Sequence, residues 1–229
     1  CSQSRGLGDV YKRQGIHEIL DPYFGSSERN LFQLLEIARE EAPIVVVLDH
    51  VDTIAGDRQR LRDNQARNLA NQLLHQLHLL TVGEERILVV GCTDTPWHLD
   101  RSFLRPGRFG QPIFVAPPDR EDRRAILEGL AASRPVEELD LETLASLTRG
   151  FSGADLAAMF DLAGERALST AAEKGEFHLL TMDALSEARR AVVPSTAAWF
   201  RLAQKSMPRV QNDEVFASIH QAVTDNRRA

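Results

Sequence analysis

Two short apolar runs restrict the possible folds of this chain more than any other feature. Ile44–Leu48 is apolar at every position and rich in β-branched residues, and Ile87–Gly91 repeats this pattern. A strand that is apolar on both faces is typical of a parallel sheet with helices on both sides. Leucines at helical spacing mark helices across Asn30–Glu41 and Asn68–Leu80. Helices that alternate with apolar strands predict a parallel α/β sheet, and residues 112–117, PIFVAP, are expected to add a third strand.

Helical segments dominate the chain beyond Pro117–Asp119, where the composition changes. Pro135, Gly150 and Gly175 separate these segments, and proline and glycine are residues that end helices. The expected helices lie within 119–132, 139–148, 153–175, 181–192, 194–207 and 213–223. The sequence therefore predicts a helical domain after the α/β core.

The first residues, Cys1–Gln14, are excluded from the predicted fold. They lack an initiator methionine and any apolar period. They resemble a translated sequencing adaptor and are treated like a tag or fusion scar, with a natural flexible terminus as the alternative. The predicted organisation is a non-native or disordered segment over 1–14, an α/β core over 15–118, a helical domain over 119–195 and C-terminal helices over 196–229.

Charge and composition exclude several classes of function. The 229 residues include 27 basic and 33 acidic side chains, a formal net charge of −6, which argues against a nucleic-acid surface that works by bulk charge. No apolar run approaches the roughly 18 residues of a membrane helix. Cys1 and Cys92 lie far apart, so a reducing compartment is expected. We therefore expect a cytoplasmic protein with no nucleic-acid partner and no membrane segment in this chain, while an anchor upstream stays open.

Charged residues lie at the end of the first apolar strand and in the loop after the second. Asp49 ends the first one, and a carboxylate at the carboxyl end of a parallel strand suits a nucleotide-bound Mg²⁺. The alternative is that Asp49 caps the following turn. After the second strand, Pro106 and Gly107 fix the positions of Arg105 and Arg108, whose planar guanidinium groups can bind a phosphate. Surface ion pairs are the alternative for these two arginines.

Several motifs occur in a fixed order along the chain. They are YFGSSERN at 23–30, IVVVLDHVDTI at 44–54, ILVVGCTD at 87–94, RPGRF at 105–109 and GFSGADL at 150–156. In this order and spacing they resemble the AAA+ ATPases, most closely the branch of valosin-containing protein, katanin, spastin and the membrane protease FtsH. The resemblance covers Ile16–Ser195. It implies a P-loop NTPase type of parallel-sheet core, here without its Walker A strand, followed by a small helical lid domain.

The resemblance implies roles for five residues at a nucleotide site. Asp49 matches the Walker B aspartate that holds Mg²⁺, and Arg105 and Arg108 match the arginine fingers that reach the γ-phosphate of the neighbouring subunit. Gly153 and Ala154 match lid positions whose backbone packs near the adenine. Members of the family work as ring hexamers. The resemblance therefore implies a site for ATP and Mg²⁺ that two subunits build together, in a homo- or hetero-hexamer.

The resemblance also implies a contact with substrate. Tyr23, Phe24 and Gly25 match the aromatic pore loop that grips a threaded polypeptide, and aromatic rings can contact any chain. An aromatic pair packed under a loop is the alternative. The arginines within 58–62 fall where the family has a second pore loop, and a solvated charged loop is the alternative there.

Three departures from the family pattern bear on activity. The sequence has no G-x-x-x-x-G-K-[ST] motif, the Walker A loop that cradles phosphates, which truncation explains better than degeneration. His50 replaces the catalytic Walker B glutamate, and a histidine accepts a proton only when it is neutral. At the sensor-1 position, Asp94 replaces the usual asparagine, and an ionised carboxylate cannot donate a hydrogen bond to phosphate. His50, Asp94, Arg105 and Arg108 are therefore the candidate catalytic residues, and weakened hydrolysis is expected.

Two functions stay open. The first is an AAA+ ATPase module that couples ATP hydrolysis to protein unfolding or remodelling in a ring, although the chain as given is expected to be inactive. The second is a noncatalytic AAA+ subunit that supplies arginine fingers or scaffolding to an active partner. Trp199 and Phe200 in the C-terminal part are expected either to anchor a subunit interface or to pack against their own lid domain.

Overall fold

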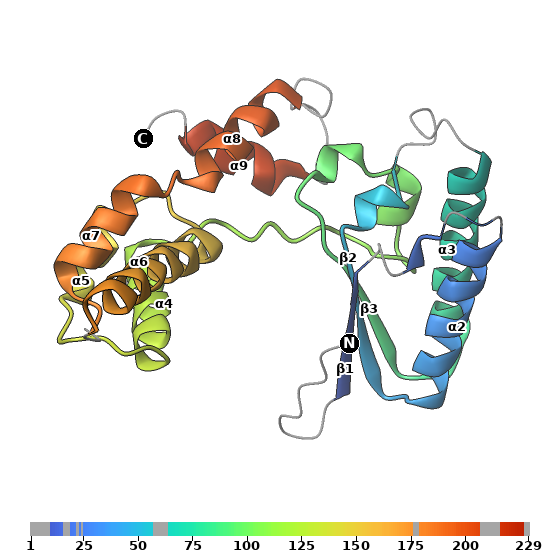
Figure 1. Ribbon diagram of the computed structural model, residues 1–229. Coiled ribbons are helices and arrows are strands. Elements are labelled where there is room, and N and C mark those ends of the chain that lie inside the picture. The colour runs from blue at the N-terminus through green and yellow to red at the C-terminus, as the bar shows by residue number, and fades with distance from the viewer. Residues whose placement is uncertain are drawn as a thin grey trace. The chain divides into compact units, whose positions relative to one another are not determined.

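The computed structural model describes residues 10–15, 19–21, 23, 25–56, 64–175, 179–206 and 216–226. The chain divides into two compact units (Figure 1). The first comprises Cys1–Ile113 and Arg209–Ser218, and the second comprises Phe114–Pro208 and Ile219–Ala229. Within the described ranges, no helix is both long and apolar enough to cross a membrane.

A three-stranded parallel sheet forms the centre of the first unit. Its strands are β1 (Val10–Gly15), β2 (Ile44–Asp49) and β3 (Ile87–Gly91), and β2 lies between the other two. In the register of the sheet, Ile44 lies opposite Val10 on one side and Ile87 on the other. Because β2 and β3 coincide with the two apolar runs, the predicted α/β fold with a parallel sheet is confirmed.

Two helices, α2 (Ser26–Glu40) and α3 (Asn64–Val82), lie along one face of this sheet (Figure 1). The described part of the unit also contains three short 3₁₀ turns: η1 (Val51–Thr53), η2 (Pro96–His98) and η3 (Arg101–Leu104). Apolar residues recur at helical spacing on the sheet-facing side of each helix and are buried together with every second residue of β2. The central members of this core are Leu31, Leu35, Ala38, Val46, Leu48, Leu73 and Leu77.

The opposite face of the sheet is only partly covered by described residues. Val45 and Val47 of β2 lie on this face, since side chains alternate along a strand, and they pair with Leu88 and Val90 of β3. Leu88 is 59% exposed and Val90 is 38% exposed. The prediction that helices cover both faces is therefore wrong for the described part of the chain, because α2 and α3 pack on the same side.

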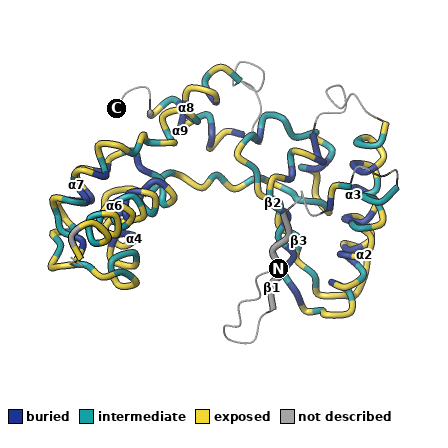
Figure 2. Tube along the Cα trace, in the orientation of Figure 1, coloured by how far each residue is buried: buried dark blue, intermediate teal, exposed yellow. Residues whose placement is uncertain are grey.

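The strand predicted at residues 112–117 does not form. Ile113 and Val115 are 90% and 84% exposed, and the segment is exposed or half-buried throughout (Figure 2). A strand needs a neighbour that binds its backbone N–H and C=O groups, and among the described strands β3 pairs only with β2. The prediction fails because the segment pairs with none of the described strands, although its apolar pattern suits a strand.

The strand β1 corrects the exclusion of Cys1–Gln14 from the fold. Val10–Gly15 pairs in parallel with β2, whereas residues 1–9 lie outside the described residues. Backbone groups make a parallel ladder, so any extended segment can pair with the open edge of a strand without an apolar pattern of its own. The exclusion was therefore wrong for residues 10–14.

Helices make up the second unit. They are α4 (Arg120–Ala132), α5 (Leu141–Leu147), α6 (Gly153–Lys174), α7 (Met182–Ala191), α8 (Ser195–Ser206) and, from Ile219 on, α9 (Ala217–Asn226). Asp119, Asp140, Ser152 and Thr181 cap the first four by accepting a backbone N–H of the first turn. Their buried core includes Leu127, Leu144, Leu156, Phe160 and Leu185. The predicted helical domain is confirmed.

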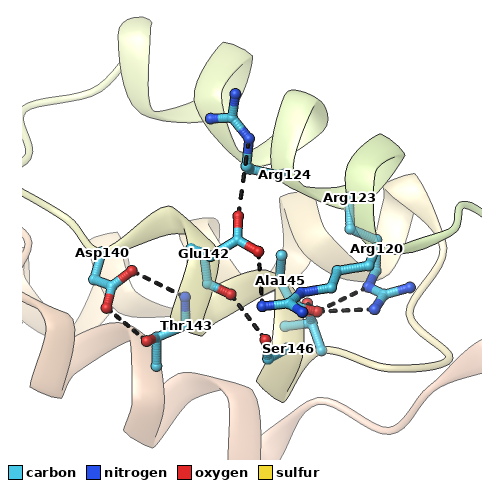
Figure 3. Close-up of polar contacts among 9 residues, drawn as sticks. Arg120, Arg123, Arg124, Asp140, Glu142, Thr143, Ala145 and Ser146 are labelled. Carbon is cyan, nitrogen blue, oxygen red and sulfur yellow. Dashed lines mark hydrogen bonds and ion pairs between the residues drawn. The ribbon is translucent and has the colours of Figure 1, made fainter.

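Arg123 is buried, at 6% exposure, and connects α4 to α5. Its Nε and Nη2 donate to the carbonyl of Ala145 at 3.2 and 2.8 Å (Figure 3). Its Nη1 donates to the carbonyl of Pro118 at 2.9 Å. The last carbonyls of a helix lack partners within the helix, and the Ala145 carbonyl is one of them. Arg124, the next residue, forms an exposed ion pair with Glu142 instead.

We expect Arg123→Leu to lower the free energy of unfolding by about 2–4 kcal/mol, because two carbonyls lose a charged donor. Arg124→Leu is the matched control on the same helix, since an exposed ion pair contributes only about 0–1 kcal/mol. Urea unfolding followed by circular dichroism measures both variants. Equal losses in the two variants would contradict the structural role of Arg123.

Candidate functional site

The carboxyl ends of β2 and β3 meet at one edge of the sheet. Cys92, the residue after β3, donates its N–H to the carbonyl of the penultimate residue of β2 at 2.8 Å. Val51 donates its N–H to the carbonyl of Cys92 at 2.9 Å. These bonds extend the ladder beyond the strands, so Asp49 and His50 lie beside the loop that carries Asp94.

His50 adopts a left-handed backbone, with φ 56° and ψ 44°. It is the one non-glycine residue with positive φ in the described part of the chain, and this conformation costs roughly 1–2 kcal/mol for most side chains. Histidine is among the residues that tolerate it best. The His50 N–H donates to Oδ1 of Asp49 at 3.2 Å, and the side chain of His50 is exposed. The predicted magnesium ligand and the residue at the glutamate position therefore share one tight turn.

Asp52 connects the two strand ends through its side chain. Its carboxylate accepts hydrogen bonds from the hydroxyls of Thr93, at 2.5 Å, and Thr95, at 2.8 Å. The N–H of Thr95 also donates to Oγ1 of Thr93 at 3.0 Å. Asp94 lies between the two threonines, so its backbone is held on both sides. The sequence alone assigned no role to Asp52, Thr93 or Thr95, because no local pattern signals a contact between residues 41 positions apart.

Phe109 of the RPGRF motif packs over the end of β3. A Cβ atom at Gly91 would lie 3.1 Å from the ring of Phe109, so glycine leaves the space that this ring occupies. Phe109 also stacks on the buried Phe103, with ring centroids 6.1 Å apart. These contacts place the arginine-bearing loop at the same edge of the sheet as Asp49.

The two arginines of this loop differ in their surroundings. Gly107 has φ 79°, and the N–H of Arg108 donates to the carbonyl of Arg105 at 3.2 Å, the pattern of a type II turn with Pro-Gly at its centre. The hydroxyl of Thr81 donates to the Gly107 carbonyl at 2.7 Å. Arg108 is half-buried and donates from Nη1 to the carbonyl of Ser102. Arg105 is exposed, and among the described residues its guanidinium has no partner. Of the pair, Arg105 is thus the one free to reach another molecule.

The Asp49 carboxylate fits the requirements of a magnesium ligand. It is half-buried at the carboxyl end of a parallel strand, and Mg²⁺ in nucleotide sites is bound by one or two carboxylates together with phosphate oxygens. In the described ranges, no group of three or more His, Cys, Asp or Glu side chains could hold a metal ion by itself. The Walker A loop that would bind the phosphates is missing from the sequence. The residues present therefore suit the metal side of a nucleotide site better than its phosphate side.

The predicted pore loop precedes α2. Tyr23 is 75% exposed, and its N–H donates to Oδ1 of Asp21 at 2.8 Å. The tyrosine ring is therefore not packed under a loop, which contradicts the alternative for this residue. Gly25 has φ 77°, a backbone conformation that favours glycine. Phe24 and the arginines within 58–62 lie outside the described residues.

Gly153 and Ala154 form the start of α6 in the second unit, directly after the N-cap Ser152. Ala154 is exposed and Gly153 is half-buried. Backbone N–H groups in the first turn of a helix have no partners within the helix and are available to a ligand. The contact with adenine stays a prediction.

A parallel α/β core with an acidic residue at a strand end, followed by a unit of capped helices, has the architecture that the resemblance to the AAA+ ATPases implies. The comparison with protein families identifies the module. Residues 7–117 match the model of the ATPase family associated with various cellular activities (AAA), and residues 138–189 match the AAA+ lid domain. The chain belongs to the AAA ATPase family.

Two similar proteins support this assignment. The cell division cycle protein 48 homolog of Archaeoglobus fulgidus is 38% identical over 152 residues, which are 66% of this chain and 21% of that protein. Protein SAV of Sulfolobus acidocaldarius is 34% identical over 143 residues, which are 62% of this chain and 18% of that protein. The chain thus spans about a fifth of the length of these curated relatives.

Proposed function

We propose that this chain is the part of an AAA+ ATPase module that contributes the magnesium carboxylate, the sensor loop and an arginine for the neighbouring subunit. The observation that supports this most is the placement of Asp49, the Asp94 loop and the RPGRF loop at one edge of the sheet, with Arg105 exposed. The proposed whole module hydrolyses ATP in a ring hexamer and remodels a polypeptide substrate that Tyr23, Phe24 and Gly25 contact.

Each residue of the proposed site has a separate task. Asp49 holds Mg²⁺, which neutralises charge on the phosphates when it is bound. Arg105 stabilises the charge that develops on the phosphoryl group bound by the next subunit. Arg108 keeps the loop in shape through the carbonyl of Ser102. Gly153 and Ala154 contribute to the adenine side.

Hydrolysis is weakened in this proposal for two reasons. A histidine at position 50 takes a proton from water only in its neutral form, whereas a glutamate is available as a base throughout the neutral pH range. An ionised Asp94 accepts hydrogen bonds but cannot donate one to phosphate as an asparagine does. The missing Walker A loop makes the chain inactive by itself.

A chimaera tests the proposal. Residues 16–206 of this chain, which include every residue of the proposed site and helix α8, would replace their counterparts in the Archaeoglobus fulgidus homolog, which retains its own flanking sequence. We expect Mg²⁺-dependent ATP turnover by the chimaera and its loss in the Asp49→Asn variant, because an amide is a much weaker magnesium ligand than a carboxylate. Turnover is measured as phosphate release at saturating ATP. A folded chimaera whose turnover is unchanged by Asp49→Asn would exclude the proposed role of Asp49.

The second candidate is a noncatalytic subunit that supplies Arg105 to an active partner. The observation that favours it is the coexistence of an exposed, unpartnered arginine in the described loop with a histidine at the glutamate position. In that case the chimaera has no turnover of its own and raises the turnover of an active subunit with which it is mixed.

A further inference from the structure

Asp155 is a buried carboxylate at the start of α6, at 8% exposure. It takes part in the capping box of this helix: its N–H donates to Oγ of Ser152 at 3.2 Å, and its Oδ2 accepts the N–H of Ser152 at 2.8 Å. The same Oδ2 accepts two further hydrogen bonds from Ser195, the first residue of α8. They come from the backbone N–H at 3.0 Å and from the hydroxyl at 2.9 Å. One carboxylate oxygen therefore joins the N-termini of two helices.

Further contacts support the same junction. Oγ of Ser152 and Oγ of Ser195 lie 3.2 Å apart. The hydroxyl of Thr196 donates to the carbonyl of Gly150, a residue with φ 82°. The turn at residues 150–155, which contains the GFSGAD part of the motif, is thus connected at several points to the first turn of α8.

Helix α8 in turn contacts Phe114, the residue that begins the second unit. Trp199, one turn along α8, stacks on Phe114 with ring centroids 5.8 Å apart, and its ring meets that of Phe200 edge-on at 5.2 Å. Phe200 is buried. Both aromatic residues thus have contacts within their own unit, and the subunit interface stays a prediction.

We propose that Asp155 is a positioning residue that couples the turn at residues 150–155 to helix α8, so that a displacement of this turn moves the first turn of α8 and the Trp199–Phe114 contact with it. The link between this coupling and nucleotide binding rests on the proposed function, in which Gly153 and Ala154 of the same turn contribute to the adenine side of the site. The coupling itself requires only contacts within the second unit, which has its own hydrophobic core.

The carboxylate accepts these bonds most strongly in its ionised form. Burial by itself raises the pKa of Asp155, but the hydrogen bonds from Ser152 and Ser195 outweigh burial, and the pKa lies below its ordinary value of 3.8. Within the described residues, no charged side chain forms a hydrogen bond or ion pair with it. A carboxyl group whose pKa is lowered in the folded state stabilises that state above its unfolded pKa, and this contribution is lost as the pH falls through the folded value.

Amide hydrogen exchange of the full chain tests the coupling without nucleotide. In Asp155→Ala, we expect the amides of Ser195–Trp199 to exchange at least about tenfold faster, the effect of losing one charge-assisted hydrogen bond. Asp161→Ala is the matched control, because Asp161 is an exposed carboxylate on the same helix and pairs only with Arg134 among the described residues. It should leave these amides unchanged.

A milder variant covers the case in which Asp155→Ala unfolds the lid. Ser195→Ala keeps the cap of α6 and removes one hydroxyl donor, so faster exchange should be confined to the start of α8.

An acid titration gives a second measurement. In a Trp97→Phe background, Trp199 is the only tryptophan, and its fluorescence emission follows the loss of structure around α8 as the pH falls. The acid transition of Ser195→Ala should lie at a higher pH than that of the parent, because the carboxylate loses a donor. Unchanged exchange at Ser195–Trp199 in a folded Asp155→Ala or Ser195→Ala variant overturns the proposal.

A separate experiment tests whether nucleotide binding acts through this coupling. MgADP added to the chimaera should slow exchange both at residues 150–155 and at the start of α8, and Ser195→Ala should retain only the first effect. Protection of α8 that persists in Ser195→Ala overturns the coupling. A chimaera that binds no MgADP contradicts the proposed function, while the exchange results without nucleotide still decide whether Asp155 positions α8.

Discussion

Arg105→Ala is expected to lower ATP turnover of the chimaera by about 10³-fold, the lower end of the range for an arginine that stabilises phosphoryl transfer from a neighbouring subunit. The expected change lies in kcat, with little change in KM for ATP, because the guanidinium acts on charge that develops in the transition state. The exposure of Arg105 and its lack of a partner among the described residues are the basis of this expectation.

Two further variants give this experiment its controls. Arg86→Ala removes an exposed arginine at the amino end of β3, at the other edge of the sheet, and should leave turnover unchanged. Arg108→Ala should lower both turnover and thermal stability, because Arg108 holds the loop through the Ser102 carbonyl. If Arg105→Ala reduces turnover only after mixing with an active partner, the noncatalytic alternative is favoured. If it reduces turnover in neither case, Arg105 is not an arginine finger.

His50→Glu is expected to raise turnover of the chimaera by about 10²-fold or more, the usual contribution of a well-placed general base. The same change should lower the free energy of unfolding by about 1 kcal/mol, since glutamate tolerates the left-handed backbone of residue 50 less well than histidine. Activity and stability therefore change in opposite directions at this position. Phosphate release at saturating ATP and urea unfolding measure the two effects.

His50→Asn separates the chemistry from the backbone. Asparagine adopts the left-handed conformation readily, so stability should be retained, but its amide cannot take a proton from water and turnover should not rise. If His50→Asn raised ATP turnover as much as His50→Glu, backbone strain at residue 50, and not the missing base, would limit the reaction. No gain with glutamate would remove His50 as the limiting residue.

Local patterns were sufficient for most helices and for two of the three strands. The apolar runs at Ile44–Leu48 and Ile87–Gly91 are strands, and the breaks at Pro135, Gly150 and Gly175 locate four lid helices to within a few residues. Apolar periodicity and helix-ending residues act over a few positions, so they can be recognised without knowledge of the rest of the molecule. The position of Asp49 at the carboxyl edge of the sheet follows in the same way.

Strand pairing could not be derived locally. Residues 112–117 have a suitable apolar pattern but no neighbouring strand among those described, whereas Val10–Gly15 has no such pattern and forms β1. Whether an extended segment becomes a strand depends on a free strand edge, which another part of the chain provides. The exposure of Leu88 and Val90 has a similar cause, because it depends on where α2 and α3 pack.

Long-range hydrogen bonds set the details of the site. Asp52 meets Thr93 across 41 positions, and Asp155 meets Ser195 across 40. The amino-acid order alone predicted which residues bind magnesium, phosphate and a polypeptide, since short motifs carry that chemistry. In the described part of the folded chain, Arg108 binds the carbonyl of Ser102 whereas Arg105 is exposed, and Asp52 and Asp155 join segments that lie far apart in the sequence. Partners so far apart in sequence meet only after strands and helices have packed, and no motif records that packing.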